Sequence, residues 1–214
     1  MAKPGLLLVS IDPSSGWDDV YNSSSLALNA IPSAVSKLVL QAKDDPDPEK
    51  PYRYQIMFPL QNVSAISIPE TVQKLSGLSA ADVTLSLYER LNFHALDPDT
   101  SPESTNLIVQ VGLTPKDDRE VYEDYHKWYG TEHIQRLMAV PGWRTGSRYL
   151  LLERGGSRKE YAAPLLSVHR YDKENGLGGA EWAKSIHTEW TKRVDSNKAR
   201  PPHRRVFEVQ KVEL

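Results

Sequence analysis

The predicted order of strands and helices repeats once along the 214-residue chain, and this repeat restricts the fold more than any other feature. In the second half, apolar periodicity and turn residues predict strands at residues 106–113, 147–153, 164–172 and 205–214. Helices are predicted between them, at residues 117–139 and 180–194. This is the β-α-β-β-α-β order of a ferredoxin-like unit, so we expect an α+β fold.

The first half follows the same order less clearly. Its predicted strands cover residues 6–11, 52–60 and 83–91, and its predicted helix covers residues 68–77. Residues 17–42 show a helical tendency interrupted near Pro32, so only one clear strand lies between the two helices. The segment DPDTSPEST is rich in turn formers. We therefore divide the chain into an N-terminal half (1–97), a linker (98–105) and a C-terminal half (106–214).

The composition narrows the class of protein. Lys and Arg number 26 against 28 Asp and Glu, so there is no electrostatic reason to expect binding to nucleic acid or to an anionic membrane. The chain has no cysteine, which excludes disulfides and thiolate metal sites. The apolar run Leu6–Val9 is too short for a signal peptide or a membrane span. We expect a cytoplasmic protein.

One segment concentrates polar aromatic residues. Residues 122–143, YEDYHKWYGTEHIQRLMAVPGW, contain two of the six histidines and three of the ten tyrosines. Four polar aromatic residues fall on one face of the predicted helix: Tyr122, His126, Tyr129 and His133. Burying such groups costs free energy unless each is hydrogen-bonded. A shared polar pocket would satisfy all four.

Other residues of this segment have different expected positions. Tyr125 and Trp128 fall on the flank of the polar aromatic face. Glu132 lies about a hundred degrees around the helix from His133, so we expect it to pair outside the pocket. Gly130 costs about 1 kcal/mol relative to alanine in a helix, which indicates a local bend or a close approach to the backbone.

The motifs W-Y-x-x-E-H-I, V-P-G-W and S-R-Y resemble those of tandem dimeric α/β-barrel proteins related to the EthD family, of fungal type. The resemblance is specific over residues 118–150. Two positions depart from the family pattern: Gly130 replaces an Asp, and Gln135 replaces a Pro. The first half lacks the E-H pair, so one site per chain is expected. The matching residues are Trp128, Tyr129, Glu132, His133, Pro141, Gly142, Trp143, Arg148 and Tyr149.

The resemblance implies two ferredoxin-like halves that close one intramolecular, pseudo-dimeric barrel, with the helices outside. It also implies an apolar pocket between the first helix of the second half and its sheet. A monomer is expected, because the partner half is already part of the chain, although further oligomerisation is possible. Similar barrels include polyketide cyclases, lactone isomerases and hydroxynitrile lyases.

Several other chemistries have little support in the sequence. His126 and His133 are two helical turns apart, H-E-x-x-H is absent, and no cysteine is available, so we expect no metal. The nucleophile motif G-x-S-x-G is absent. Because related barrels include haem proteins, His133 or His169 as an axial haem ligand remains an alternative.

Cofactor-free acid/base chemistry on a small aromatic or polyketide-like carbonyl compound is the leading hypothesis. Histidine suits proton abstraction, and a tyrosine hydroxyl suits an oxygen that gains negative charge. Cyclisation, isomerisation, dehydration and decarboxylation all fit, and so does a protein that binds the compound without converting it. We expect His133, Tyr129 and His126 to be catalytic. The expected substrate-binding residues are Tyr122, Trp128, Trp143, Tyr149 and His169.

Overall fold

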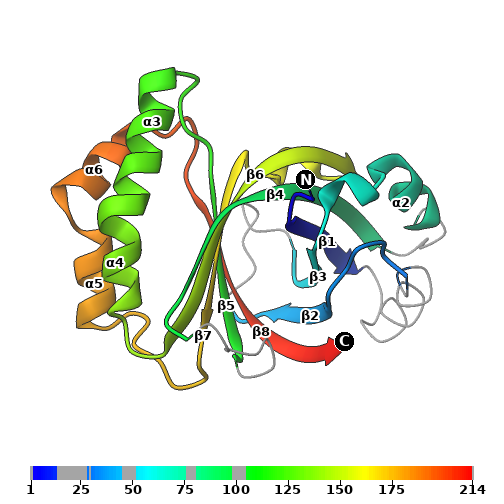
Figure 1. The fold of residues 1–214 in the computed structure, drawn as a ribbon, viewed down its shortest axis with the longest axis horizontal. Helices are drawn as coiled ribbons and strands as arrows, with labels where there is room; N and C mark the ends of the chain where they lie inside the picture. Colours follow the sequence, from blue (N-terminus) through cyan, green and yellow to red (C-terminus); the bar gives the residue numbers. More distant parts are fainter. Residues whose placement is uncertain are drawn as a thin grey trace.

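Eight antiparallel strands form a closed barrel in a computed structural model that describes residues 2–13, 28, 30–44, 52–75, 81–97 and 105–213 (Figure 1). Around the barrel the strands follow the order β1-β3-β2-β8-β5-β7-β6-β4. The strands are β1 (Gly5–Pro13), β2 (Lys37–Ala42), β3 (Tyr54–Leu60), β4 (Ala81–Ala95), β5 (Leu107–Leu113), β6 (Trp143–Gly156), β7 (Leu165–Tyr171) and β8 (His203–Glu213).

Helices α3 to α6 of the second half lie on one side of the barrel, against the sheet of β5 to β8 (Figure 1). Helix α2 lies on the far side, against the strands of the first half and the end of β6. The described helical segments are η1 (Val63–Ala65), α2 (Ile68–Leu75), α3 (Arg119–Trp128), the π-helical turn η3 (Tyr129–His133), α4 (Ile134–Met138), η4 (Lys159–Tyr161), α5 (Ala180–Ile186) and α6 (Glu189–Ser196).

Each half contributes one four-stranded sheet with the ferredoxin-like strand order. In the first half the order is β4-β1-β3-β2, and in the second it is β8-β5-β7-β6. The two sheets join along two seams, where β2 pairs with β8 and β4 pairs with β6. The predicted α+β fold with two ferredoxin-like halves in one intramolecular barrel is therefore confirmed.

Side-chain alternation along the strands produces three apolar cores. One fills the barrel interior and includes Leu6, Ile108 and Phe207. The other two lie outside the barrel, between each half's sheet and the helices that cover it. In the second half, successive residues of β7 therefore face either the barrel interior or the helices.

Two sequence predictions were wrong in detail. Residues 37–42, assigned to a segment with helical tendency, form strand β2 and pair with both β3 and β8. The helix predicted over residues 180–194 is two helices, because Thr188 caps the second one: its hydroxyl accepts the Thr191 N–H at 2.9 Å. The predicted linker lies outside the described residues except for Thr105.

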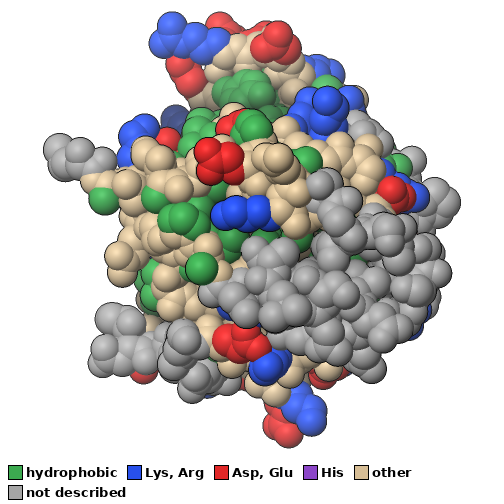
Figure 2. Space-filling view, turned by 90° about the vertical axis from the view of Figure 1, so that its right-hand side faces the viewer, with side chains coloured by type: hydrophobic (Ala, Val, Ile, Leu, Met, Phe, Trp, Pro, Cys, Tyr) green, Lys and Arg blue, Asp and Glu red, His purple; other side chains and the backbone are tan. Residues whose placement is uncertain are grey.

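On the face that carries the first half, charged side chains of both signs are scattered among uncharged ones, with no broad patch of one sign among the atoms described (Figure 2). Within the described ranges, no helix combines the length and apolarity that a membrane crossing requires.

Tight packing at the start of β1 gives the first prediction. A Cβ on Gly5 would lie 2.2 Å from the Tyr88 carbonyl oxygen, which belongs to the neighbouring strand and cannot rotate away. Gly5→Ala should therefore lower the free energy of unfolding by about 3 kcal/mol, measured by urea denaturation. Gly130→Ala is the matched control, because a Cβ there meets nothing within 4 Å. It should stabilise the protein by up to about 1 kcal/mol, and an equal loss in both variants would contradict the packing argument.

Candidate active site

The helix that carries the E-H motif changes its hydrogen-bond pattern at the motif. The side chain of Asp118 caps α3 by accepting the Glu120 N–H at 2.7 Å. After Trp128 the chain forms a π turn, in which the Ile134 N–H bonds to the carbonyl of Tyr129, five residues back. Such turns are rare and occur frequently at functional sites. The irregularity predicted at Gly130 is thus a π turn.

A cavity of about 390 Å³ lies between the helices α3 to α6 and the sheet of β5, β7 and β8. Most of its wall is apolar, formed by residues such as Val109, Val111, Leu113 and Leu137. Its polar and aromatic lining includes Tyr125, Trp128, Tyr129, His133, Ser167 and His169. Charged residues in its lining are Asp195, Lys198 and Arg204, and the first two form an ion pair.

His169, on β7, is 3% exposed and uses both ring nitrogens. The Trp143 indole N–H donates to its Nδ1 at 3.2 Å. Nδ1 therefore carries no proton, and the N–H of the neutral ring is at Nε2, which donates to the Tyr129 hydroxyl oxygen at 3.0 Å. Burial lowers the pKa of His169 to about 3, so the ring is neutral.

The opposing strand leaves room for this histidine only because residue 146 is glycine. Gly146 on β6 pairs with His169 on β7. A Cβ on Gly146 would lie 2.7 Å from His169 Nδ1 and 3.0 Å from the Trp143 ring. The hydrogen bond between Trp143 and His169 therefore depends on the absence of a side chain at Gly146.

His133, at the end of the π turn, has a different arrangement. Its Nδ1 lies 3.1 Å from the Ser185 carbonyl oxygen, which can only accept, so Nδ1 carries the proton. In the neutral ring the lone pair is then on Nε2. The ring stacks on Trp128 with centroids 4.1 Å apart. Burial lowers the pKa of His133 to about 4, although the Ser185 carbonyl and Asp195 act in the opposite direction.

Two hydrogen-bond donors lie beside His133 in the cavity wall. Trp128 is buried, and within the described part of the chain its indole N–H has no partner, which costs free energy. The Tyr129 hydroxyl accepts from His169, so its own hydrogen is left for Ser167 or for a ligand. Burial raises the pKa of Tyr129 well above its ordinary value, so the hydroxyl keeps its proton.

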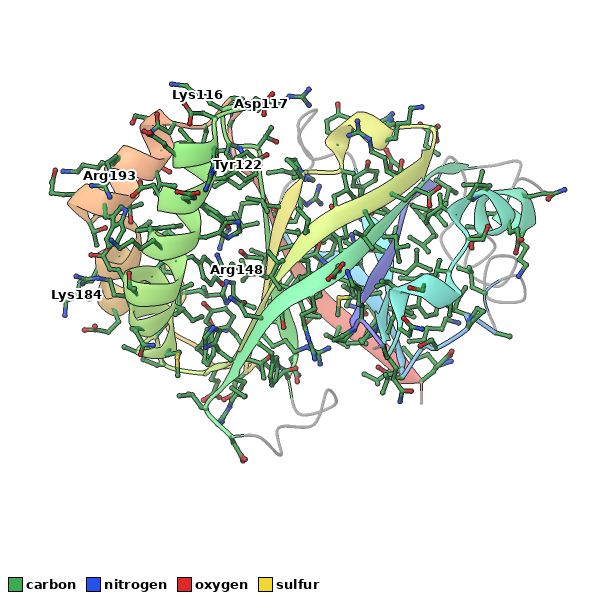
Figure 3. All side chains as sticks on the ribbon, turned by 45° about the horizontal axis from the view of Figure 1, so that its top comes forward. Lys116, Asp117, Tyr122, Arg148, Lys184 and Arg193 are labelled. Atoms are coloured by element: carbon green, nitrogen blue, oxygen red, sulfur yellow. The ribbon has the colours of Figure 1, made fainter. Side chains whose placement is uncertain are left out.

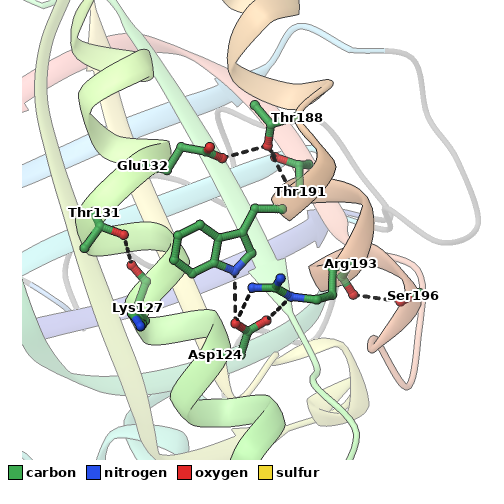
Figure 4. Close-up of polar contacts among 9 residues, drawn as sticks. Asp124, Lys127, Thr131, Glu132, Thr188, Thr191, Arg193 and Ser196 are labelled. Atoms are coloured by element: carbon green, nitrogen blue, oxygen red, sulfur yellow. Dashed lines mark hydrogen bonds and ion pairs between the residues drawn. The ribbon is translucent and has the colours of Figure 1, made fainter.

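Helix α6 is fastened to the segment that carries the site (Figure 4). Asp124 accepts hydrogen bonds from the Trp190 indole at 3.0 Å and from the Arg193 guanidinium at 2.7 Å. Glu132 accepts the Thr188 hydroxyl at 2.7 Å. The prediction that Glu132 pairs outside the pocket is confirmed.

Four residues expected at the site do not line this cavity: His126, Tyr122, Tyr149 and Trp143. His126 accepts a hydrogen bond from Arg148, whose Nη1 lies 3.1 Å from its Nδ1 between α3 and the sheet (Figure 3). Tyr122 lies one helical turn before His126 and is only partly buried. Tyr149 points into the barrel, on the opposite face of the sheet.

The remaining expected residues are brought together. His133, Tyr129, Trp128 and His169 line the cavity, while Trp143 reaches it through His169. Tyr125 and Trp128, predicted on the flank of the polar aromatic face, are buried and line the cavity as well. The residues that the sequence analysis did not predict for the site are Tyr125, Ser167, Trp182, Ser185, Asp195, Lys198 and Arg204.

The residues present fit a haem poorly. Both ring nitrogens of His169 are already bonded. His133 Nε2 is free, but its ring lies flat against Trp128, and the other histidine of the lining, His187, is exposed. The cavity volume is near the lower end of the range of about 300–1,000 Å³ typical of ligand pockets, which suits a small ligand better than a macrocycle. No group of three or more metal-ligating side chains occurs among the described residues.

The fold is similar to several solved structures over nearly the whole chain. An anthrone oxidase-like protein superposes with a TM-score of 0.62 and 13% identity, covering 98% of this chain and 92% of that one. A mutant chlorite dismutase from Candidatus Nitrospira defluvii gives 0.58 and 8%, covering 95% and 90%. A monooxygenase candidate from Lactobacillus acidophilus gives 0.55 and 10%, covering 99% and 96%. No protein-family model and no curated protein sequence matches the chain.

The buried histidines predict an acid-sensitive fold. Because the pKa of His133 falls from 6.5 to about 4 on folding, the unfolded chain binds a proton that the native state does not. Stability is therefore complete above pH 6.5 and has decreased by about 2 kcal/mol for this residue when the pH falls to 4.5. His133→Gln should reduce the loss measured by urea unfolding between pH 7 and pH 4.5 by about that amount. Exposed His187, changed to Gln, is the control; the same loss in wild type and His133→Gln would contradict the prediction.

Proposed function

We propose that the chain is a cofactor-independent acid/base enzyme that removes a proton from a small aromatic carbonyl compound bound in the His133 cavity. The observation that supports this most directly is the fixed tautomer of His133. Its Nδ1–H is held by the Ser185 carbonyl, so an unprotonated Nε2 remains on a residue that lines an apolar cavity. A positioned imidazole of this kind can act as a general base.

The cavity and the basicity of His133 restrict the substrate. A volume of about 390 Å³ with mainly apolar walls suits two or three fused rings. A histidine whose pKa is lowered to about 4 is a weak base, so it takes a proton only from a carbon acid whose anion is well delocalised. Aromatic ketones and polyketide-like carbonyl compounds have this property. The structural similarity to an anthrone oxidase-like protein supports the same class.

The proposed step is a single proton transfer. The C–H bond next to, or conjugated with, the carbonyl breaks, the proton moves to His133 Nε2, and the electron pair is delocalised onto the carbonyl oxygen. That oxygen would accept a hydrogen bond from the Tyr129 hydroxyl. The imidazolium would be stabilised by Asp195, whose charge favours protonation of His133. Return of the proton to another atom gives isomerisation. Loss of a leaving group instead gives dehydration, and ring closure gives cyclisation.

The first test measures proton abstraction directly. Anthrone in deuterated buffer should exchange its methylene protons faster with the protein than without it, as followed by NMR. Positioned acid/base catalysis contributes about 10² to 10⁴-fold, so His133→Ala should lower the enhancement by that amount while the protein stays folded. His126→Gln, outside the cavity, should keep the wild-type rate. Full exchange activity in His133→Ala would exclude the assignment.

The pH dependence provides a second test. The base form of His133 exists above its pKa, so kcat/KM for exchange should fall only as the pH decreases through about 4. An acid limb near the ordinary histidine value of 6.5 would contradict His133 as the buried base.

A protein that binds the compound without converting it is the rival hypothesis. Anthrone would then quench tryptophan fluorescence, through binding near Trp128, without any enhanced exchange. Binding that survives in His133→Gln together with no exchange in wild type would favour this rival.

A further inference from the structure

A second cavity, of about 330 Å³, opens inside one end of the barrel, on the opposite face of the sheet from the His133 cavity. It forms where β1, β2 and β6 begin and where β3, β4 and β7 end. Among the described residues, its lining contains two arginines, Arg90 and Arg170, and no aspartate or glutamate. The cavity is therefore positively charged, although the whole chain has a net charge of −2.

Among the described residues, neither arginine has an anionic partner. The Arg170 side chain on β7 makes no hydrogen bond or ion pair there, and burial lowers the pKa of its guanidinium. The Arg90 guanidinium on β4 lies 5.5 Å from the centroid of the Phe93 ring. The nearest carboxylate in sequence, Glu89, is already paired with Lys3 at 2.9 Å. Arg170 is partly buried, so its charge without a counter-ion costs free energy that a bound anion would recover, whereas Arg90 is exposed to the solvent.

Hydroxyl-bearing residues lie opposite both arginines in the strand register and line the same cavity. Thr145 lies directly opposite Arg170 in the register of β6 and β7, and Tyr149 lies opposite Arg90 in the register of β4 and β6. The charges of both arginines favour the ionised form of Tyr149, although burial raises its pKa overall. Both guanidinium groups therefore act on the same phenol, which places them on one region of the cavity.

We propose that this end of the barrel binds an organic carboxylate, with its head group between Arg170 and Arg90. The planar guanidinium fork matches a carboxylate with two parallel hydrogen bonds. Thr145, Ser147 and Tyr149 supply further donors at the same place. Much of the rest of the wall is apolar, with Leu6, Met57 and Val168 beside the polar Ser36 and Gln61, so the ligand carries a hydrocarbon or aromatic body. An inorganic anion would not contact the apolar part of the wall.

Benzoate and inorganic phosphate are suitable probes, measured by isothermal titration calorimetry and thermal denaturation. Benzoate should bind saturably and raise Tm. Arg170→Gln should weaken its binding on the order of tenfold or more, because a charge-assisted bond is lost. Without ligand, Arg170→Gln should unfold at the same temperature as wild type or higher, since it removes an uncompensated charge. This second readout separates a ligand-binding role from a structural one.

Arg204→Gln is the matched control, because Arg204 lines the other cavity. It should leave benzoate binding unchanged. Loss of benzoate binding in Arg204→Gln but not in Arg170→Gln would overturn the proposal, as would tighter binding of phosphate than of benzoate. The absence of saturable binding by either probe would also overturn it. None of these outcomes depends on His133 chemistry.

Discussion

Hydrogen bonding between the edge strands of the two sheets is the constraint on which the rest of the molecule depends. A four-stranded ferredoxin-like sheet has two edges with unpaired backbone N–H and C=O groups, and each is a site for aggregation or pairing. Here both edges of one sheet pair with both edges of the other, at β2–β8 and β4–β6. Closure buries the inner faces as one core and supports the sheet behind the His133 cavity.

The candidate site uses this support to hold polar groups that would otherwise be costly to bury. The Trp143–His169–Tyr129 chain runs from one strand to its neighbour and then to the helix. It fixes the distance between β7 and the π turn, and with it the depth of the cavity. His133 is held separately, from α5, by the Ser185 carbonyl. His169 and His133 thus have opposite tautomers. Both ring nitrogens of His169 are hydrogen-bonded within the fold, whereas Nε2 of His133 presents a lone pair.

The sequence predicted the fold well because the repeated element order and the motif of residues 128–149 are strong signals. Strand β2 was missed because a short apolar run such as Leu38–Leu40 suits a buried helix as well as a strand. Ser167 shares the alternation of His169 and could have been predicted from it. The Ser185 contact could not, because a backbone carbonyl has no residue-type signal. The bond between Trp143 and His169 depends on the β6–β7 register, which no local pattern reveals.

The π turn at residues 129–133 lets the helix hold one extra residue beside the site while the rings on either side of it stay on one face. A π turn holds one more residue than the α-helical turn it replaces. Loss of one residue there would restore regular α-helical geometry and leave Trp128 and His133 four residues apart, which is again a same-face spacing. The extra residue is thus accommodated inside the helix, where the two rings stack and line the same wall of the cavity. In a chain of this architecture, one inserted codon can be absorbed as a π turn within the helix that carries the site.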